Sequence, residues 1–123
     1  MMMTSSERKP SMSGIPDTAI SADVAQSLAR AHAFVEHARV AADQGLQLTD
    51  LALGMRCFEV AYLLIDAGAI PSAELLSEPR AGTPGQLITA AAEVLDAIAE
   101  DDRPVGLLTA RVALATAQTM ASE

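Results

Sequence analysis

Hydrophobic positions recur every three or four residues along most of the chain, which is the period of an amphipathic α-helix. In the first such segment, from about Ser21 to Gln44, they form one narrow stripe that is half alanine: Val24, Leu28, Ala31, Val35, Ala38 and Ala42. Asp17 or Ser21 can cap the start of this helix, and Gly45 its end. Because small residues let a neighbouring helix approach closely, the stripe predicts a tight helix–helix contact.

A second helix is predicted between Thr49, a good N-cap, and Gly68, which suits a left-handed residue after a helix end. Leu48 and Leu53 have the spacing of a hydrophobic staple. Two apolar stripes run along this helix: Leu51, Met55, Phe58, Tyr62, Ile65, and beside them Leu53, Cys57, Val60, Leu64. A helix that is apolar on most of its circumference is expected to be buried on most sides. We therefore predict that it is the central helix.

Prolines mark the starts of two further helices. Pro71 predicts a short helix over 72–76, because proline suits the first helical position. After a loop over 77–82, Thr83-Pro84-Gly85-Gln86 has the form of a capping box. The helix that it opens carries two apolar rows: Leu87, Ala91, Val94, Ile98, and Ile88, Ala92, Leu95, Ala99. The corner at 64–76 resembles the helix–Gly–helix corner of an armadillo-type repeat, but it does not recur at a solenoid period, so it indicates an isolated corner.

The last helix is expected to start after Asp101, Asp102 and Pro104 and to end near Met120. Its apolar positions are Val105, Leu108, Val112, Ala115 and, beside them, Leu107 and Leu114. No segment alternates with a period of two. The pattern predicts an all-α fold, an antiparallel helical bundle of four long helices plus one short helix, built from residues 18–123. Residues 1–17 lack a hydrophobic period and are expected to be a disordered tail.

Composition changes this picture in two ways. Half of the 123 residues are hydrophobic and only 2% are aromatic. A domain of this size has much surface for its volume, and a monomer would therefore leave many of these side chains exposed. We expect a homodimer for this reason. The net charge is −8, Lys9 is the only lysine, and the arginines are scattered among carboxylates. This balance argues against nucleic-acid binding and favours a basic partner protein.

Several functional classes find no support in the sequence. With Lys9 alone in the tail, a lysine Schiff base or a P-loop lysine is not expected, and no Gly-rich phosphate loop, CxxC, HExxH or GxSxG motif occurs. Cys57 has no second cysteine to pair with and is expected to be a buried, inert thiol. No signal peptide and no apolar stretch long enough to cross a membrane is recognised, so we expect a cytoplasmic protein.

Five polar side chains are the candidate ligand-binding residues: His32, Glu36, Arg56, Glu59 and Tyr62. His32 and Glu36 are four residues apart and could donate two metal ligands, but no Glu-x-x-His unit accompanies them. An ordinary pair on a solvent-facing helix, with no metal and no cofactor, is the preferred interpretation. Arg56 and Glu59 could orient a carboxylate ligand, although a local ion pair on a wet edge is favoured. Tyr62 is expected to be a core tyrosine rather than a catalytic acid.

Two functions remain open at this point. The absence of a catalytic signature favours a small non-catalytic interaction or accessory protein that acts as a homodimer, rather than an enzyme. The alternative is a small helical enzyme or ligand-binding protein with an apolar pocket between helices, which would hold a small apolar ligand. That alternative requires the five candidate side chains to converge on one cavity.

Overall fold

The computed structural model describes residues 21–78 and 80–122, and within them the chain forms four long helices, one short helix and no strand. The elements are α1 (Ala22–Asp43), α2 (Leu48–Asp66), α3 (Ala73–Ser77), α4 (Pro84–Asp96), the one-turn 3-10 helix η2 (Glu100–Asp102) and α5 (Leu107–Ser122). The prediction of an all-α helical bundle is therefore confirmed. The predicted tail at 1–17 lies outside the described residues.

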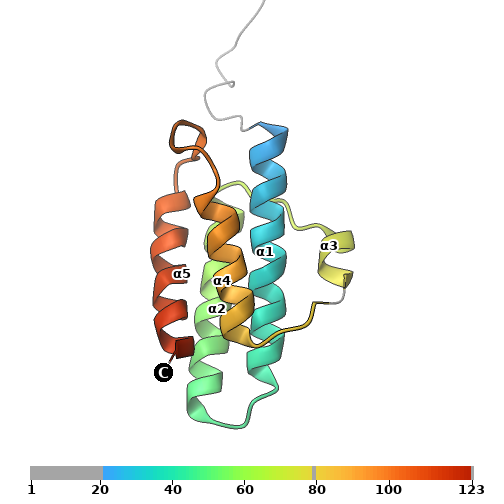
Figure 1. Cartoon of the computed structure of the whole chain (residues 1–123), viewed down its shortest axis with the longest axis vertical. Coiled ribbons are helices and arrows are strands. Elements are labelled where there is room, and N and C mark those ends of the chain that lie inside the picture. The colour runs from blue at the N-terminus through green and yellow to red at the C-terminus, as the bar shows by residue number, and fades with distance from the viewer. Residues whose placement is uncertain (1–20, 79, 123) are drawn as a thin grey trace, which may run out of the picture.

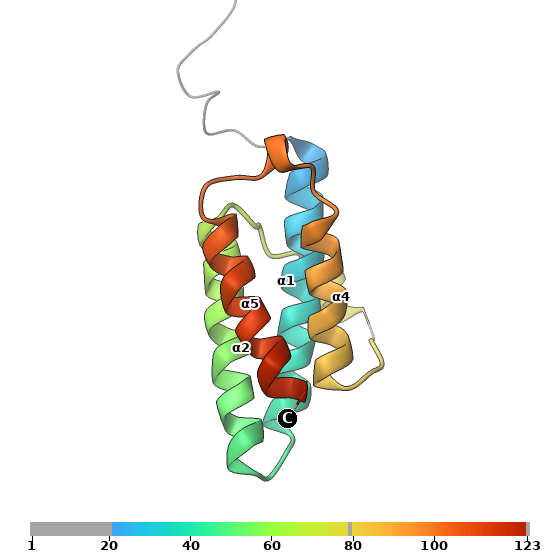
Figure 2. The same ribbon diagram turned by 60° about the vertical axis from the view of Figure 1, so that its left-hand side comes forward.

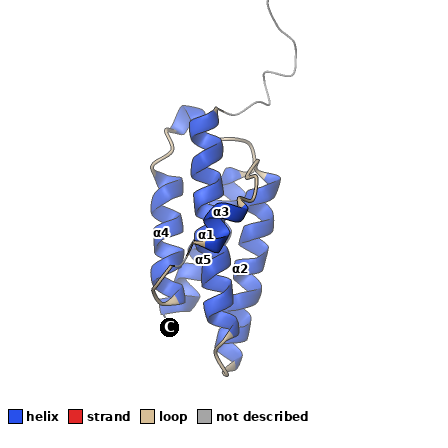
Figure 3. Cartoon of the chain, turned by 90° about the vertical axis from the view of Figure 1, so that its right-hand side faces the viewer, coloured by secondary structure: helices blue, strands red, loops and turns tan. Residues whose placement is uncertain are grey.

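The four long helices pack in a ring, in which each helix contacts two of the others. α1 packs against α2 and α4, and α5 packs against the same two helices from the other side. Figure 1 shows that the neighbours in this ring run in opposite directions, since α1 and α5 descend while α2 and α4 ascend. The short helix α3 belongs to the connection between α2 and α4 and lies over the outer side of α1 (Figure 3).

Local capping signals account for most of the helix starts. Ser21 Oγ accepts a hydrogen bond from the backbone N–H of Val24 at 3.1 Å and caps α1, whereas Asp17 lies outside the described residues. The predicted capping box of α4 is present, with Thr83 Oγ1 and the side chain of Gln86 exchanging bonds with each other's backbone N–H. These starts follow from residues within one turn of the helix, so the sequence could predict them.

Two predicted helix boundaries are wrong in detail, and a third is correct. α2 begins at Leu48, because Gln47 and Asp50 form a capping box and take the role expected of Thr49. Gly68 does adopt a left-handed φ of 122° after α2, as expected. Gly45, by contrast, is not among the glycines with positive φ, and α1 ends through the right-handed residue Gln44.

The core is aliphatic and is lined by the inner stripes of the four long helices. The alanine-rich stripe of α1 is entirely buried, as predicted, and so are both apolar rows of α4 apart from Val94, which is half-buried, and Ala99, which is exposed. On α5, Leu107 and Leu114 are buried. The other predicted stripe of that helix is wrong, because Val105 precedes α5 and the side chains of Leu108 and Val112 are more than half exposed.

The second helix, α2, is not the central helix that its composition predicted. Only the stripe Leu53, Cys57, Val60, Leu64 faces the core. The stripe Leu51, Met55, Phe58, Tyr62, Ile65 points to solvent. In Figure 2, α2 forms an edge of the bundle, with α5 and α1 on its inner side. None of the described helices has both the length and the apolar composition required to cross a membrane.

Candidate functional site

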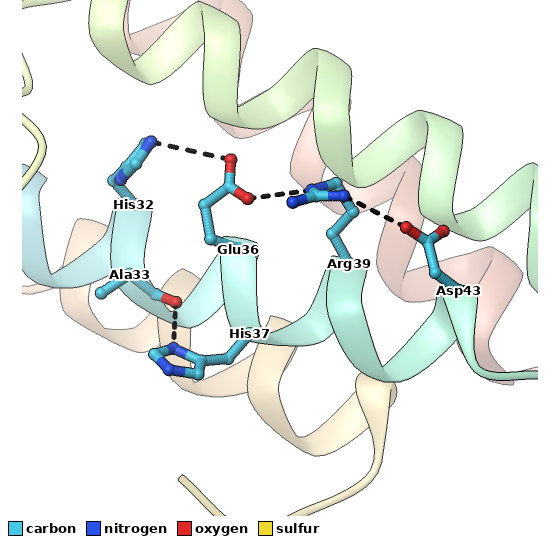
Figure 4. Close-up of polar contacts among 6 residues, drawn as sticks. All are labelled: His32, Ala33, Glu36, His37, Arg39 and Asp43. Carbon is cyan, nitrogen blue, oxygen red and sulfur yellow. Dashed lines mark hydrogen bonds and ion pairs between the residues drawn. The ribbon is translucent and has the colours of Figure 1, made fainter. Parts of the chain in front are cut away.

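Four side chains of α1 form a continuous polar row along the edge of this helix that faces α2 (Figure 4). We name His32, Glu36, Arg39 and Asp43 the α1 polar row. Glu36 lies in the middle, with Oε2 3.9 Å from His32 Nε2 and with Oε1 accepting a hydrogen bond from Arg39 Nε at 2.9 Å. Arg39 Nη1 then donates to Asp43 Oδ2 at 3.1 Å. Spacings of four, three and four residues place all of them on one helical face.

His32 is buried, which corrects the prediction that it lies on a solvent-facing side of its helix. The residue is 3% exposed. Burial lowers the pKa of His32 because the protonated imidazole would lose its hydration, and the nearby Glu36 carboxylate opposes this effect more weakly. The imidazole is therefore mainly neutral at pH 7. Within the described part of the chain its Nδ1 atom has no hydrogen-bond partner.

A cysteine–histidine nucleophile is not formed near this row. Cys57 of α2 is fully buried, and this burial, together with the charge of Glu36, raises the pKa of its thiol to about 11. A protonated thiol is a poor nucleophile, and a neutral His32 does not supply the positive charge that would activate it. The other histidine, His37, points to the opposite side of α1 and donates from Nδ1 to the carbonyl oxygen of Ala33 at 2.7 Å (Figure 4).

The remaining three candidates lie on the exposed side of α2. Arg56 Nη1 and Glu59 Oε1 form an ion pair that is open to solvent, which confirms the expected pair on a wet edge. An open groove beside this pair is lined also by Ala52, Met55 and by Met120 of α5. Tyr62 is 64% exposed, so the prediction of a core tyrosine is wrong.

The five candidate residues are thus not gathered at one place. His32 and Glu36 contact each other on α1, and Arg56 and Glu59 contact each other on the side of α2 that adjoins α5. Neither pair reaches the other, and Tyr62 points away from the bundle. The structure therefore does not provide the common cavity on which the ligand-binding alternative depended.

Sequence reasoning missed two members of the α1 polar row. Arg39 lies three residues after Glu36, and Asp43 lies four residues after Arg39. These spacings are a local signal for ion pairs on a helix. The hydrogen bond to Glu36 raises the pKa of Arg39 further above its usual range. Glu36, Arg39 and Asp43 of this row are paired charges along one helix, an arrangement typical of ion pairs that stabilise a helix.

A pocket that the sequence did not indicate lies at the corner between α4 and α5. It has a volume of about 370 Å³, and its lining includes Leu95, Asp96, Arg103, Pro104, Leu107 and Arg111. Arg111 binds both carboxylate oxygens of Asp96, at 2.8 and 3.1 Å, and Arg103 Nε donates to the carbonyl of Ile98 at 3.1 Å. Both arginines therefore form contacts with α4 or its C-terminal end, Arg111 from α5 and Arg103 from the loop before α5.

Among the described residues, exposed apolar side chains follow one another along α2. Six large hydrophobic side chains of α2, 43–84% exposed, follow one another along its outer side, and we name them the α2 outer face: Leu48, Leu51, Met55, Phe58, Tyr62 and Ile65. Scattered exposed hydrophobic residues are ordinary, whereas a contiguous apolar patch marks an interaction surface.

The described residues contain no group of three or more His, Cys, Asp or Glu side chains arranged to hold a metal ion. The fold and these surfaces define the described part of the chain as an all-α helical bundle in which α2 exposes an apolar face. Comparison with protein-family models, curated proteins and solved structures gave no match.

Proposed function

We propose that the chain is a non-catalytic interaction or accessory protein that acts as a homodimer, and that a second copy covers the α2 outer face. The observation that supports this proposal is the row of six large apolar side chains on the solvent side of α2. Water contact with such a row is unfavourable by about 25 cal/mol for each Å² of apolar surface. A partner that removes this surface from water is therefore favoured.

The size of the face fits a dimer of this small chain. If a large apolar side chain offers about 200 Å², the exposed fractions of the six residues amount to roughly 750 Å² per copy. Stable specific interfaces bury about 800 Å² per partner. The α2 outer face therefore has nearly the whole area that an interface requires, without a contribution from the other helices.

The α2 outer face is a better candidate for the dimer contact than the alanine-rich stripe of α1. The stripe on α1 is buried inside the chain, so it is used for the contacts of α1 with its own neighbours. The α2 outer face instead holds six of the large hydrophobic side chains that stay exposed after the core is formed. The net charge of −8 still leaves the rest of the surface suited to a basic partner protein.

The mass of the protein in solution tests this proposal. We expect light scattering at micromolar concentration to give twice the chain mass of 12.8 kDa. Phe58→Glu removes two buried phenyl groups per dimer, at about 2 kcal/mol each, so the dissociation constant should rise by roughly a thousandfold. Leu108→Glu is the matched control, since Leu108 is 76% exposed on α5 and lies outside the α2 outer face; this variant should remain dimeric.

Two results would overturn the proposal. One is a strict monomer for the unaltered chain under these conditions. The other is a dimer that survives Phe58→Glu but is lost with Leu108→Glu, which would assign the contact to α5. Circular dichroism of both variants should retain the helical signal of the unaltered chain, because the two positions are exposed and their substitution leaves the core intact.

A further inference from the structure

We propose that the two copies pair through antiparallel α2 helices, about a two-fold axis that passes α2 between Arg56 and Cys57. This inference rests on the proposed homodimer and adds its geometry. It starts from the spacing of the α2 outer face, whose six residues follow one another at intervals of three, four, three, four and three. Such a repeat of 3.5 residues is the seam of a coiled coil.

The seam is self-complementary when it is reversed. Leu48 and Ile65, Leu51 and Tyr62, and Met55 and Phe58 each lie at equal distances from the point between Arg56 and Cys57. In an antiparallel pair centred at this point, every residue of the seam is therefore level with its counterpart from the second copy. Because an isologous interface requires this reciprocal contact, the seam satisfies a two-fold axis along its whole length.

Side-chain size also favours the reversed pairing. Each aromatic ring of the seam meets an unbranched or aliphatic chain, since Phe58 faces Met55 and Tyr62 faces Leu51 of the second copy. Large and small side chains then interdigitate, and a thioether beside an aromatic ring adds a favourable contact. A parallel pair in register would instead stack Phe58 on Phe58 and Tyr62 on Tyr62, with the smaller residues left facing each other.

The charged residues beside the seam also favour the antiparallel pair. Arg56 and Glu59 lie on the flank of α2 that adjoins α5, where they share a groove with Met120. A two-fold axis perpendicular to the helices brings this flank of both copies to the same side. At a rise of 1.5 Å per residue, Glu59 then lies about 3 Å along the helix from Arg56 of the second copy. The ion pair within each chain can thus extend into a neutral group of four charges across the interface.

A parallel pair would place like charges together. It would bring the α5 flank of one copy against the α1 flank of the other, and in a parallel seam Glu59 would lie beside Gly54 of the second copy. Asp43 of α1 lies directly over Gly54, since a Cβ added there would overlap the Asp43 side chain. The carboxylates of Glu59 and Asp43 would then approach each other, and although each keeps its own arginine, Arg56 or Arg39, no new contact between opposite charges is gained.

Site-directed cross-linking tests this arrangement. Leu48→Cys and Ile65→Cys are introduced into separate chains, which are unfolded, mixed, refolded together and oxidised. In the antiparallel dimer, positions 48 and 65 of different copies face each other, whereas position 48 lies about 26 Å along the helix from itself. We therefore expect covalent dimers from the mixture and none above background from either variant alone. The chain with only Cys57, which is fully buried, is the background control.

The outcomes separate this inference from the proposed function. Cross-links within each single variant would indicate a parallel dimer and overturn the antiparallel arrangement while leaving the homodimer intact. A dimeric mass with no cross-link from any combination would assign the interface to another surface, which also overturns it. A monomeric mass would overturn both. Leu51→Cys mixed with Tyr62→Cys provides a second check of the register and should cross-link in the same pairwise manner.

Discussion

Gly54 of α2 lies beside Asp43, the last residue of the α1 polar row, and its substitution tests that contact quantitatively. The residue is buried in the interior of α2, and its φ is not in the positive range that would require glycine. In Gly54→Ala, the new Cβ would overlap the side chain of Asp43, while the methyl group of Ala42 lies at an ordinary contact distance of 3.9 Å. The carboxylate of Asp43 is the end of a flexible, half-exposed side chain, so it can rotate away.

Two effects of opposite sign then determine the result. Replacing glycine by alanine in a helix interior stabilises the helix by about 1 kcal/mol, because the unfolded chain loses conformational freedom. Rotation of Asp43 breaks its bond to Arg39, and an exposed i, i+4 ion pair contributes about 0.5 kcal/mol. The helix term is larger. We therefore expect Gly54→Ala to raise the free energy of unfolding by about 0.5 kcal/mol.

Urea unfolding of four chains measures both effects: the unaltered protein, Gly54→Ala, Asp43→Ala and the double variant. The protein concentration must be matched, because the proposed dimerisation would add to the apparent stability. Once Asp43→Ala has removed the carboxylate, Gly54→Ala should contribute its full gain of about 1 kcal/mol. If Gly54→Ala destabilises the protein in both backgrounds, then α1 and α2 are too close for any side chain at this position, and our account of Asp43 as the yielding partner is refuted.

Three further predictions follow from the ionisable groups. Burial lowers the pKa of His32 below its ordinary value of 6.5, so the unfolded chain takes up a proton before the folded chain does as the pH falls. The free energy of unfolding should therefore decrease between neutral and mildly acidic pH, as measured by urea unfolding. His32→Leu should flatten this decrease, whereas His37→Gln should not. Arg111→Gln should cost less than about 1 kcal/mol at neutral pH, since the Asp96 pair is exposed. The hydrogen bond from Arg111 lowers the pKa of Asp96, so this cost should be present above the ordinary value of 3.8 and vanish as the pH falls through the lower folded value, as urea curves at neutral and acidic pH would measure. Cys57, with a buried thiol of pKa about 11, should react with a thiol reagent at pH 8 only after urea is added, and rapid labelling of the native protein would contradict its burial.

The parts of the fold that could be predicted are those that depend on neighbouring residues alone. The stripe of α1 and the capping box of α4 involve side chains within a few turns of one another, and a helical period or a cap is fixed at that range. The predicted starts of α2 and α5 are wrong, although they also depend on nearby residues. α2 begins at Leu48 rather than after Thr49, because Gln47 and Asp50 form a competing cap. α5 begins at Leu107, after Gly106 with its positive φ, and so leaves Val105 outside the helix.

The burial of His32 could not be predicted from its own helix, because it depends on segments elsewhere in the sequence that pack on α1. α1 is buried on a second side at Ala29, His32 and Ala33, and α3 packs against this helix. Arg80, in the loop after α3, stacks over the ring of Phe34 at 4.3 Å, so the connection crosses α1. The hydrophobic pattern of one helix does not show which other segments pack over it. The sequence therefore predicted, wrongly, that His32 faces solvent.

The choice between the two stripes of α2 shows the same limit in a sharper form. Leu53, Cys57, Val60 and Leu64 have spacings of four, three and four, and the outer stripe starting at Leu51 has the same spacings. Periodicity therefore cannot tell which stripe faces the core. The difference lies in the partner, since α1 brings alanines to its contact and Ala42 already adjoins Gly54. The smaller stripe fits such a close approach, and Phe58 and Tyr62 do not.

This division gives α2 two surfaces with separate roles. The inner stripe joins α2 to α1 and α5, so its loss would unfold the chain. The outer stripe contributes little to the folded monomer, because its side chains are exposed, and yet it contains the largest side chains of the helix. Large hydrophobic residues that do not stabilise the monomer have a cost in solubility unless a partner covers them. We propose that this partner is a second copy, because the spacings of the outer stripe read the same in both directions and therefore allow a two-fold axis.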